Sequence, residues 1–180
     1  MVVTNITTSA NLFHALRRQL SWDFRKPLIN FSPKANLRHT NAYSSITEFT
    51  QGDFQEVIDD NTLTDSGAVS KVLLCSGKIY FELLEQRTAM QNTAIAILRL
   101  EQIYPLPYKQ LEQLKAKYAV AEWYWVQEEP RNMGALPYLL MNFDLFNLKY
   151  ISRPASASPA TGFAKLHAQE QKAIIDQALS

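Results

Sequence analysis

The chain has 180 residues, of which 47% are hydrophobic and 11% aromatic, so it can bury a core of ordinary domain size. Its 18 Lys and Arg against 17 Asp and Glu give a formal net charge of +1, which offers no electrostatic basis for binding nucleic acid or an anionic membrane. No apolar run approaches the ~20 residues that a membrane-spanning helix needs, and no secretory signal pattern opens the chain. A single cysteine, Cys75, excludes an internal disulfide, and we expect a reducing compartment, either the cytoplasm or the mitochondrial matrix.

The first recognisable pattern is helical. An apolar stripe over Asn11–Trp22 predicts an amphipathic helix, with Ser9 as its N-cap. Residues Pro27–Phe31 then predict a buried strand, which Ser32-Pro33 ends. Helix followed by strand is typical of the end of a β-α-β unit, so residues 1–38 are expected to be the tail of an α/β domain whose earlier strands are absent. On this interpretation the chain is one part of a larger protein.

The stretch from residue 39 to residue 68 is irregular, and we interpret it as a connecting segment. Ser45-Ile-Thr-Glu48 has the spelling of a capping box and predicts a short helix. Phe54–Ile58 predicts a short strand, and the polar, glycine-containing stretch Asp59–Gly67 predicts the linker itself.

Strands and helices alternate regularly from residue 69 to residue 180. Strands separated by helices of ten or more residues predict a largely parallel, doubly wound sheet in an α/β domain. The expected strands are Lys71–Ser76, Ala94–Leu100, Glu122–Gln127 and Leu148–Ser152, and the expected helices are Lys78–Gln91, Pro107–Tyr118, about Gly134–Phe146 and Phe163–Leu179.

Two places in this domain could bind an anion. Ser76-Gly77-Lys78 joins a strand to a helix, where a glycine permits close backbone approach and free helix N–H groups attract anions. The complete Walker and dinucleotide motifs are absent, so an ordinary strand-to-helix turn is the simpler interpretation. Arg153 begins a loop rich in Ser and Pro, and it is either an anion ligand or a surface arginine. Because these residues follow strands, Ser76, Lys78 and Arg153 are expected to be neighbours at the carboxyl edge of the sheet.

The remaining candidates are weaker. Glu128 and Glu129 end a strand, where neighbouring side chains point to opposite faces, so a capping or interface role is favoured over a facing acid–base pair. Cys75 lies in an apolar run and predicts an inert buried thiol. No histidine has metal-ligand spacing, so no metal site is predicted. His14 lies in the middle of a helix, where a structural role is the simpler interpretation, and on these residues alone the reaction stays undecided.

Several short stretches, taken together, are similar to one family. They are FHALRRQ at 13–19, KPL at 26–28, SPK at 32–34, SGKIY at 76–80, LEQIYPLP at 100–107, WVQEEP at 125–130 and RPASASP at 153–159. In that order and spacing they resemble the carboxyl-terminal end of the E1 component of 2-oxoglutarate dehydrogenase, over essentially the whole chain. The resemblance implies that residues 1–38 end a pyrimidine-binding domain of the transketolase type and that residues 69–180 form the C-terminal domain.

The resemblance also implies an activity and partners. This family decarboxylates 2-oxoglutarate with thiamine diphosphate and Mg²⁺ and passes the succinyl unit to the lipoyl group of the E2 component, in the tricarboxylic acid cycle. The implied partners are the rest of the E1 chain, a second E1 copy in a homodimer, and E2. The family's Gly-Asp-Gly…Asn segment for Mg²⁺ and diphosphate is missing, and its activating glutamate is expected upstream of Met1. We therefore expect the chain alone to bind no cofactor and to be inactive.

Site residues can be carried over only where the motifs match. His14 matches the histidine of the family pattern Phe/Tyr-His-x-Leu-Arg-Arg, so the resemblance implies that it is catalytic. Some members of the family are regulated by acetyl-CoA or adenine nucleotides at their C-terminal domain. That regulation implies an effector near Ser76, Lys78 and Arg153 here.

The chain departs from the family pattern in places, and two other readings stay open. Thr7–Ala10 lacks the usual Pro before the histidine-bearing helix, Met133 and Leu136 replace the usual Gln and Trp, and Ala35 and Asn36 also differ. One alternative is a self-standing regulatory or binding module with a flavodoxin-like layer. The other is a pyruvate or branched-chain E1 β chain or a transketolase, which the FHALRRQ and RPASASP strings disfavour.

Overall fold

The computed structural model describes residues 1–34 and 36–180, with only the backbone of residue 37, so the departure at Ala35 lies outside the described residues. The strands are β1 (Val2–Asn5), β2 (Leu28–Phe31), β3 (Val57–Ile58), β4 (Lys71–Cys75), β5 (Ile95–Leu100), β6 (Gln102–Tyr104), β7 (Glu122–Pro130) and β8 (Leu148–Arg153). The helices are α1 (Ser9–Ser21), α2 (Ile46–Thr50), α3 (Ile79–Ala89), α4 (Tyr108–Lys117), α5 (Leu136–Asn142) and α6 (Ala164–Leu179). No helix of the described part is long and apolar enough to cross a membrane.

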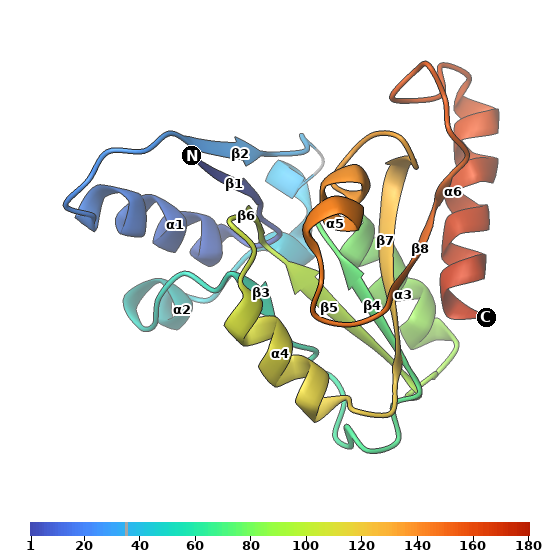
Figure 1. Cartoon of the computed structure of the whole chain (residues 1–180), viewed down its shortest axis with the longest axis horizontal. Coiled ribbons are helices and arrows are strands. Elements are labelled where there is room, and N and C mark those ends of the chain that lie inside the picture. The colour runs from blue at the N-terminus through green and yellow to red at the C-terminus, as the bar shows by residue number, and fades with distance from the viewer. Residues whose placement is uncertain (35) are drawn as a thin grey trace.

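The larger sheet has five strands in the order β3-β5-β4-β7-β8 (Figure 1). The four strands β5, β4, β7 and β8 are parallel, and β3 pairs antiparallel with β5 at the edge. Helices α4 and α5 pack on one face and α3 and α6 on the other, as the two buried clusters show. The predicted α/β layer with helices on both faces is therefore confirmed, as a mixed rather than an all-parallel sheet.

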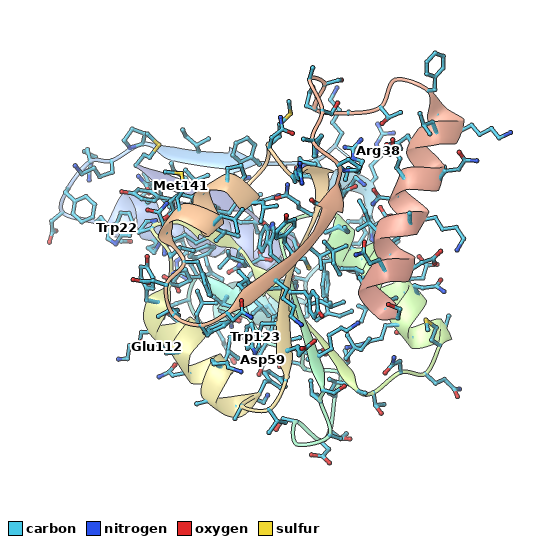
Figure 2. All side chains as sticks on the ribbon, turned by 45° about the vertical axis from the view of Figure 1, so that its right-hand side comes forward. Trp22, Arg38, Asp59, Glu112, Trp123 and Met141 are labelled. Atoms are coloured by element: carbon cyan, nitrogen blue, oxygen red, sulfur yellow. The ribbon has the colours of Figure 1, made fainter. Side chains whose placement is uncertain are left out.

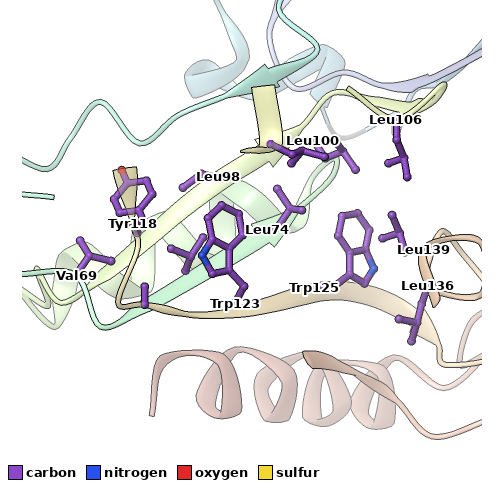
Figure 3. Packing of buried hydrophobic residues seen from close by; sticks show 14 residues of the cluster. Val69, Leu74, Leu98, Leu100, Leu106, Tyr118, Trp123, Trp125, Leu136 and Leu139 are labelled. Atoms are coloured by element: carbon purple, nitrogen blue, oxygen red, sulfur yellow. The ribbon is translucent and has the colours of Figure 1, made fainter. Parts of the chain in front are cut away.

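Burial on both faces explains the continuous apolar run in β4. Leu74 packs toward α4 and α5 in one cluster, whereas its neighbours Leu73 and Cys75 pack toward α3 and α6 in the other. Figure 3 shows the first cluster, in which the fully buried rings of Trp123 and Trp125 stand on β7. Each buried aromatic ring of this size removes a large apolar area from water, which makes this layer the main core of the chain.

A second, three-stranded sheet has the order β2-β1-β6. Strand β1 pairs parallel with β2, and α1 connects them, so the N-terminal part is a complete β-α-β unit. The expectation that the chain begins with a helix was wrong, because β1 precedes it. The strand predicted at Pro27–Phe31 is not fully buried either, because Ile29 and Phe31 are exposed and alternate with half-buried residues. Strand β6, which was not predicted, comes from the C-terminal part and pairs antiparallel with β1.

The two predicted helix caps had different outcomes. The capping box at α2 is confirmed, since Ser45 Oγ accepts from Glu48 N and the Glu48 carboxylate accepts from Ser45 N. The N-cap at Ser9 is wrong: α1 begins at Ser9, its N-cap is Thr8, and Thr8 makes no capping side-chain bond. The start of α1 is instead held by residues far away in sequence, as described below.

The polar stretch Asp59–Gly67 carries one buried ionic contact. Asp60 pairs with Arg87 of α3 and accepts a hydrogen bond from Ile97 N of β5 at 2.8 Å. Asp59, labelled beside Trp123 in Figure 2, accepts hydrogen bonds from Lys117 and Tyr118 at the end of α4. These contacts tie the stretch to both faces of the larger sheet.

Candidate functional site

The order of the larger sheet places its switch point between β4 and β7. The chain passes from β4 through α3 to β5 on one side, and later from β5 to β7 on the other side of β4. In open α/β sheets, ligands bind outside the carboxyl ends of the strands at such a reversal. Ser76-Gly77-Lys78 follows β4, and Gln127-Glu128-Glu129 forms the last part of β7.

A cavity of about 990 Å³ opens at these strand ends, and we call it the strand-end cavity. One wall comes from the smaller sheet and includes Val3, Asn5, Phe31, Ile103 and Tyr104. The other wall comes from the larger sheet and the start of α5 and includes Ser76, Lys78, Trp125, Glu128 and Tyr138. The cavity therefore joins the N-terminal β-α-β unit to the C-terminal layer, and its lining is aromatic with a charged rim, as is typical of small-molecule sites.

Lys78 is the cation of this cavity and is already paired. Its Nζ forms an ion pair with Glu128 and a second one with Glu82 at 3.1 Å. Burial lowers the pKa of Lys78, but the two carboxylates outweigh that effect and hold the pKa above its usual value. Burial, together with the nearby carboxylates of Glu82 and Glu129, raises the pKa of Glu128 above its usual value despite the pairing with Lys78. An anion that reaches Lys78 must therefore compete with Glu128.

Gly77 has a packing reason for being glycine. Its φ is +73°, and a Cβ there would lie 2.5–2.8 Å from the side-chain amide of Asn5. Ser76 Oγ donates to Asn5 O at 3.4 Å, so the turn after β4 is fitted against β1. The close packing of Gly77 against Asn5 explains why this position is glycine, and no bound phosphate is needed to explain it.

Arg153 lies on the other side of Glu128 and is not among the cavity-lining residues. Its guanidinium donates to the backbone oxygens of Glu128 and Pro159. It also donates to Thr161 Oγ1 at 3.1 Å and pairs with Glu170 at 3.3 Å. The structure thus brings Ser76 and Lys78 together at the cavity, whereas Arg153 is used to hold the Ser- and Pro-rich loop that follows β8.

His14 is buried on the inner face of α1, with 5% of its surface exposed. Its Nε2 lies 2.7 Å from Glu48 O, and its Nδ1 lies 3.0 Å from Arg17 Nη1. Since a guanidinium only donates, Nδ1 accepts and Nε2 carries the proton that Glu48 O accepts. Both ring nitrogens are therefore occupied within the chain, and His14 lies apart from the residues that line the strand-end cavity.

Two residues of the site region were not predicted from the sequence. Gln127 is buried and organises the turn before α5: its Oε1 accepts from Trp125 Nε1 and Leu136 N, both at 2.9 Å, and its Nε2 donates to Met133 O at 2.8 Å. Asn5 was missed because β1 was missed. The glutamine lies in the WVQEEP stretch, which was the one available signal for it.

The described residues do not fit a metal–diphosphate cofactor. Among them there is no group of three or more His, Cys, Asp or Glu side chains that could hold a metal ion. The sequence contains no Gly-Asp-Gly segment either.

Comparison with known proteins gives one consistent family. A sequence model described as 2-oxoglutarate dehydrogenase C-terminal matches residues 43–179. The chain is 44% identical to the 2-oxoglutarate dehydrogenase E1 component of Haemophilus influenzae, over 97% of this chain and 19% of that protein. It is 44% identical to oxoglutarate dehydrogenase of Buchnera aphidicola, over 97% of this chain and 20% of that protein. The corresponding protein of Rickettsia felis is 43% identical, over 99% of this chain and 19% of its own length, so the chain spans about a fifth of these relatives.

Proposed function

The chain belongs to the 2-oxoglutarate dehydrogenase E1 family, as its C-terminal part, and we propose that it acts within a complete E1 component that decarboxylates 2-oxoglutarate. That component uses thiamine diphosphate and Mg²⁺ and passes the succinyl unit to the lipoyl group of E2. The observation that carries the proposal is the 39–44% identity to E1 components over nearly the whole chain. The proposed setting is a homodimer in the bacterial cytoplasm, since the relatives named above are bacterial proteins.

The proposal assigns this chain a supporting share of the chemistry. The cofactor, when bound by the rest of the E1 component, supplies the carbanion chemistry that decarboxylation needs. Helix α1 of this chain forms one wall of the active site. The larger sheet and its helices form the C-terminal domain of the complete component. The chain alone is expected to be inactive because it encodes no cradle for the cofactor.

The test is substrate-dependent release of CO₂ by the complete component that carries this chain. Turnover with 2-oxoglutarate and none with pyruvate or a branched-chain 2-oxo acid is the expected result. Preferential turnover of pyruvate or a branched-chain acid would favour the related E1 β reading instead. A complete component with no decarboxylase activity would favour the self-standing binding module.

His14 is proposed as the catalytic residue of this chain. An imidazole can donate a hydrogen bond to the substrate, or accept and return a proton, at an oxygen where charge develops. In the structure its Nε2 proton is given to Glu48 O of α2. A catalytic role therefore requires that the hydrogen bond between His14 and Glu48 O break when substrate enters. We accordingly propose that α2 moves away from His14 at that step.

A glutamine substitution separates catalysis from packing. In His14→Gln the side-chain amide can still donate to Glu48 O, so the melting temperature should stay close to that of the unchanged protein. Turnover should fall on the order of a hundredfold if the imidazole is catalytic. His14→Ala is the destabilised comparison, because it leaves Glu48 O and Arg17 without a partner. Normal turnover in His14→Gln would show that His14 has a structural role and is not catalytic.

The strand-end cavity is proposed as a regulatory site for an anionic effector such as acetyl-CoA or an adenine nucleotide. Ser76 and Lys78 lie on its wall, and they would bind the phosphate end of such a ligand. Arg153 is proposed to act on this site through the backbone of Glu128, because its guanidinium is already engaged.

Ligand-induced stabilisation tests the effector. In the complete component, acetyl-CoA should raise the melting temperature of the unchanged protein but not of Lys78→Met. Lys149→Met, which removes an exposed lysine far from the cavity, is the matched control and should respond as the unchanged protein does. Equal shifts in Lys78→Met and Lys149→Met would exclude Lys78 as a ligand. Equal shifts in Arg153→Ala and the unchanged protein would remove Arg153 from the proposal.

A further inference from the structure

Glu101 is a fully buried carboxylate that has no part in the proposed chemistry. It follows β5 directly, and none of its surface is exposed. Its Oε2 accepts from Thr7 N at 2.8 Å and from Asn11 Nδ2 at 3.1 Å, and its Oε1 accepts from Thr7 Oγ1 at 2.6 Å. These donors all lie 90 or 94 residues away in sequence, around the start of α1.

Helix α1 lacks a cap of its own. Its N-cap Thr8 makes no side-chain capping bond, and its first turn contains no acidic residue. The free N–H groups at a helix start carry partial positive charge and favour a nearby anion. Glu101 places an anion near this helix start, where it accepts from Thr7 N before the N-cap and from the Asn11 side chain in the first turn. The first-turn amide Ala10 N donates instead to Ser44 Oγ at 3.1 Å.

The backbone of Glu101 also forms hydrogen bonds with other segments of the chain. Asn5 N donates to Glu101 O at 2.9 Å, and Glu101 N donates to Glu56 O at 2.9 Å. Asn11, besides its bond to Glu101, exchanges two hydrogen bonds with the backbone of Gln55, at 2.9 and 3.0 Å. The end of β1, the start of α1 and the segment before β3 are thereby joined at one residue after β5.

Glu101 occupies this place at a cost to stability. Burial raises its pKa, and this effect outweighs the contributions of Arg99, Thr7 and Asn11 that lower it. Arg99 donates to Thr7 Oγ1 at 2.9 Å, and Thr7 Oγ1 in turn donates to Glu101, so the threonine links this cation to the carboxylate. The carboxylate therefore contributes mainly the position of the segment it holds.

We infer that Glu101 is a positioning residue for His14, acting through Thr7 and Asn11 on the start of α1. Asn11 and His14 are three residues apart and lie on the same buried face of the helix, so fixing the first sets the placement of the second. The inference rests on the function proposed for His14, whereas the anchoring of α1 by Glu101 rests on the contacts alone. The two are tested by different readouts.

The test compares three variants of the complete E1 component that carries this chain. Glu101→Ala removes all three side-chain acceptor bonds. Glu101→Gln is the conservative variant, because one amide oxygen can accept from Thr7 N and Asn11 while the amide nitrogen donates to Thr7 Oγ1. Asp60→Ala is the matched control, because Asp60 is a second buried carboxylate that accepts hydrogen bonds from Arg87, Thr62 and Ile97 rather than from α1. The readouts are amide hydrogen exchange by segment, and kcat and KM for 2-oxoglutarate.

In Glu101→Ala, exchange across residues 9–15 should quicken on the order of tenfold or more relative to β4. Its kcat should fall with little change in KM, and Glu101→Gln should restore much of both. Asp60→Ala should quicken exchange near β3 and β5 without a selective effect on α1. If Glu101→Ala does not fold, Thr7→Val, which removes one donor to the carboxylate, provides the same comparison.

Unchanged exchange at α1 in Glu101→Ala, or an equal increase in β4, would overturn the anchoring role. Selective loosening of α1 with normal kcat would overturn the link to His14 while the anchor stands. If His14→Gln also turns over normally, the catalytic proposal for His14 fails independently of Glu101.

Discussion

Replacing Arg87 by Met should cost the chain a large share of its stability. The side chains of Arg87 and Asp60 are 4% and 3% exposed, and they form an ion pair between α3 and the segment before β4. Arg87 also donates to Ile95 O at 3.0 Å and to Thr62 Oγ1, while Asp60 accepts from Ile97 N. Methionine fills similar space but leaves the Asp60 charge buried without its cation.

The size of the effect follows from this burial. Removing one partner of a buried ion pair costs ~3–5 kcal/mol, because the remaining charge stays out of water. Against a typical free energy of unfolding of ~5–15 kcal/mol, that is at least about a fifth of the total. The bonds from Thr62 and Ile97 to Asp60 remain, which places the expected loss at the lower end, about 3 kcal/mol.

The same pair predicts a dependence on pH. Burial raises the pKa of Asp60, but hydrogen bonds from Arg87, Thr62 and Ile97 outweigh it, so the folded pKa lies below the usual value. The unfolded chain, with an aspartate pKa of ~3.9, takes up the proton first. The contribution of Asp60 is thus complete above that pH and is lost as the pH falls through the folded pKa.

Urea denaturation of the chain measures both effects. Arg87→Met should lower the free energy of unfolding at pH 7, and its difference from the unchanged chain should shrink as the pH falls and Asp60 takes up a proton. The control is Lys172→Met, which breaks the exposed pair with Asp176 and should leave stability nearly unchanged. A loss in Arg87→Met no larger than in Lys172→Met would refute the reasoning.

Three further predictions follow from single residues. Gly77→Ala should lower the melting temperature, because the new Cβ meets a neighbouring amide at positive φ, whereas Gly162→Ala, with no atom within 4 Å, should not; equal values would contradict this. Arg153→Lys should speed proteolysis of the loop after β8, because lysine cannot make all the hydrogen bonds by which the guanidinium holds that loop. The exposed Arg131→Lys is the control, and equal cleavage rates in the two variants would show that Arg153 does not hold the loop. Burial raises the pKa of the Cys75 thiol, so a thiol reagent should modify it only on unfolding, and rapid reaction of the native chain would count against its burial.

The larger sheet could be predicted because each of its elements has a strong local pattern. The runs at β4 and β5 are apolar on both faces, and α3, α4 and α6 are long enough to show their period, so these elements agree closely with the expected ones. Helix α5 is shorter than expected: it spans Leu136–Asn142 rather than about Gly134–Phe146. Strands β1 and β6 have only four and three residues, and both contain polar residues: Thr4 and Asn5 in β1, and Gln102 in β6. Their pairing is decided by contacts between distant segments, which no local pattern contains.

The candidate site was predictable only in part for the same reason. A glycine between a strand and a helix pointed to Ser76 and Lys78, and both line the strand-end cavity. The pairing of Lys78 with Glu128, fifty residues later, depends on the order of the strands. The occupied nitrogens of His14 depend on where α2 packs. Side-chain chemistry could be read from the sequence, whereas the partners of each side chain could not.

That the chain acts only within a complete E1 component can be tested by calorimetric titration with thiamine diphosphate and Mg²⁺. The titration is made into the chain alone and into the complete component that carries it. CO₂ release from 2-oxoglutarate is measured on the same samples. We expect binding and turnover by the complete component, and neither by the chain alone, because the chain encodes no Gly-Asp-Gly cradle. A micromolar isotherm with turnover for the isolated chain would show that these residues hold the cofactor by themselves, against the proposed function.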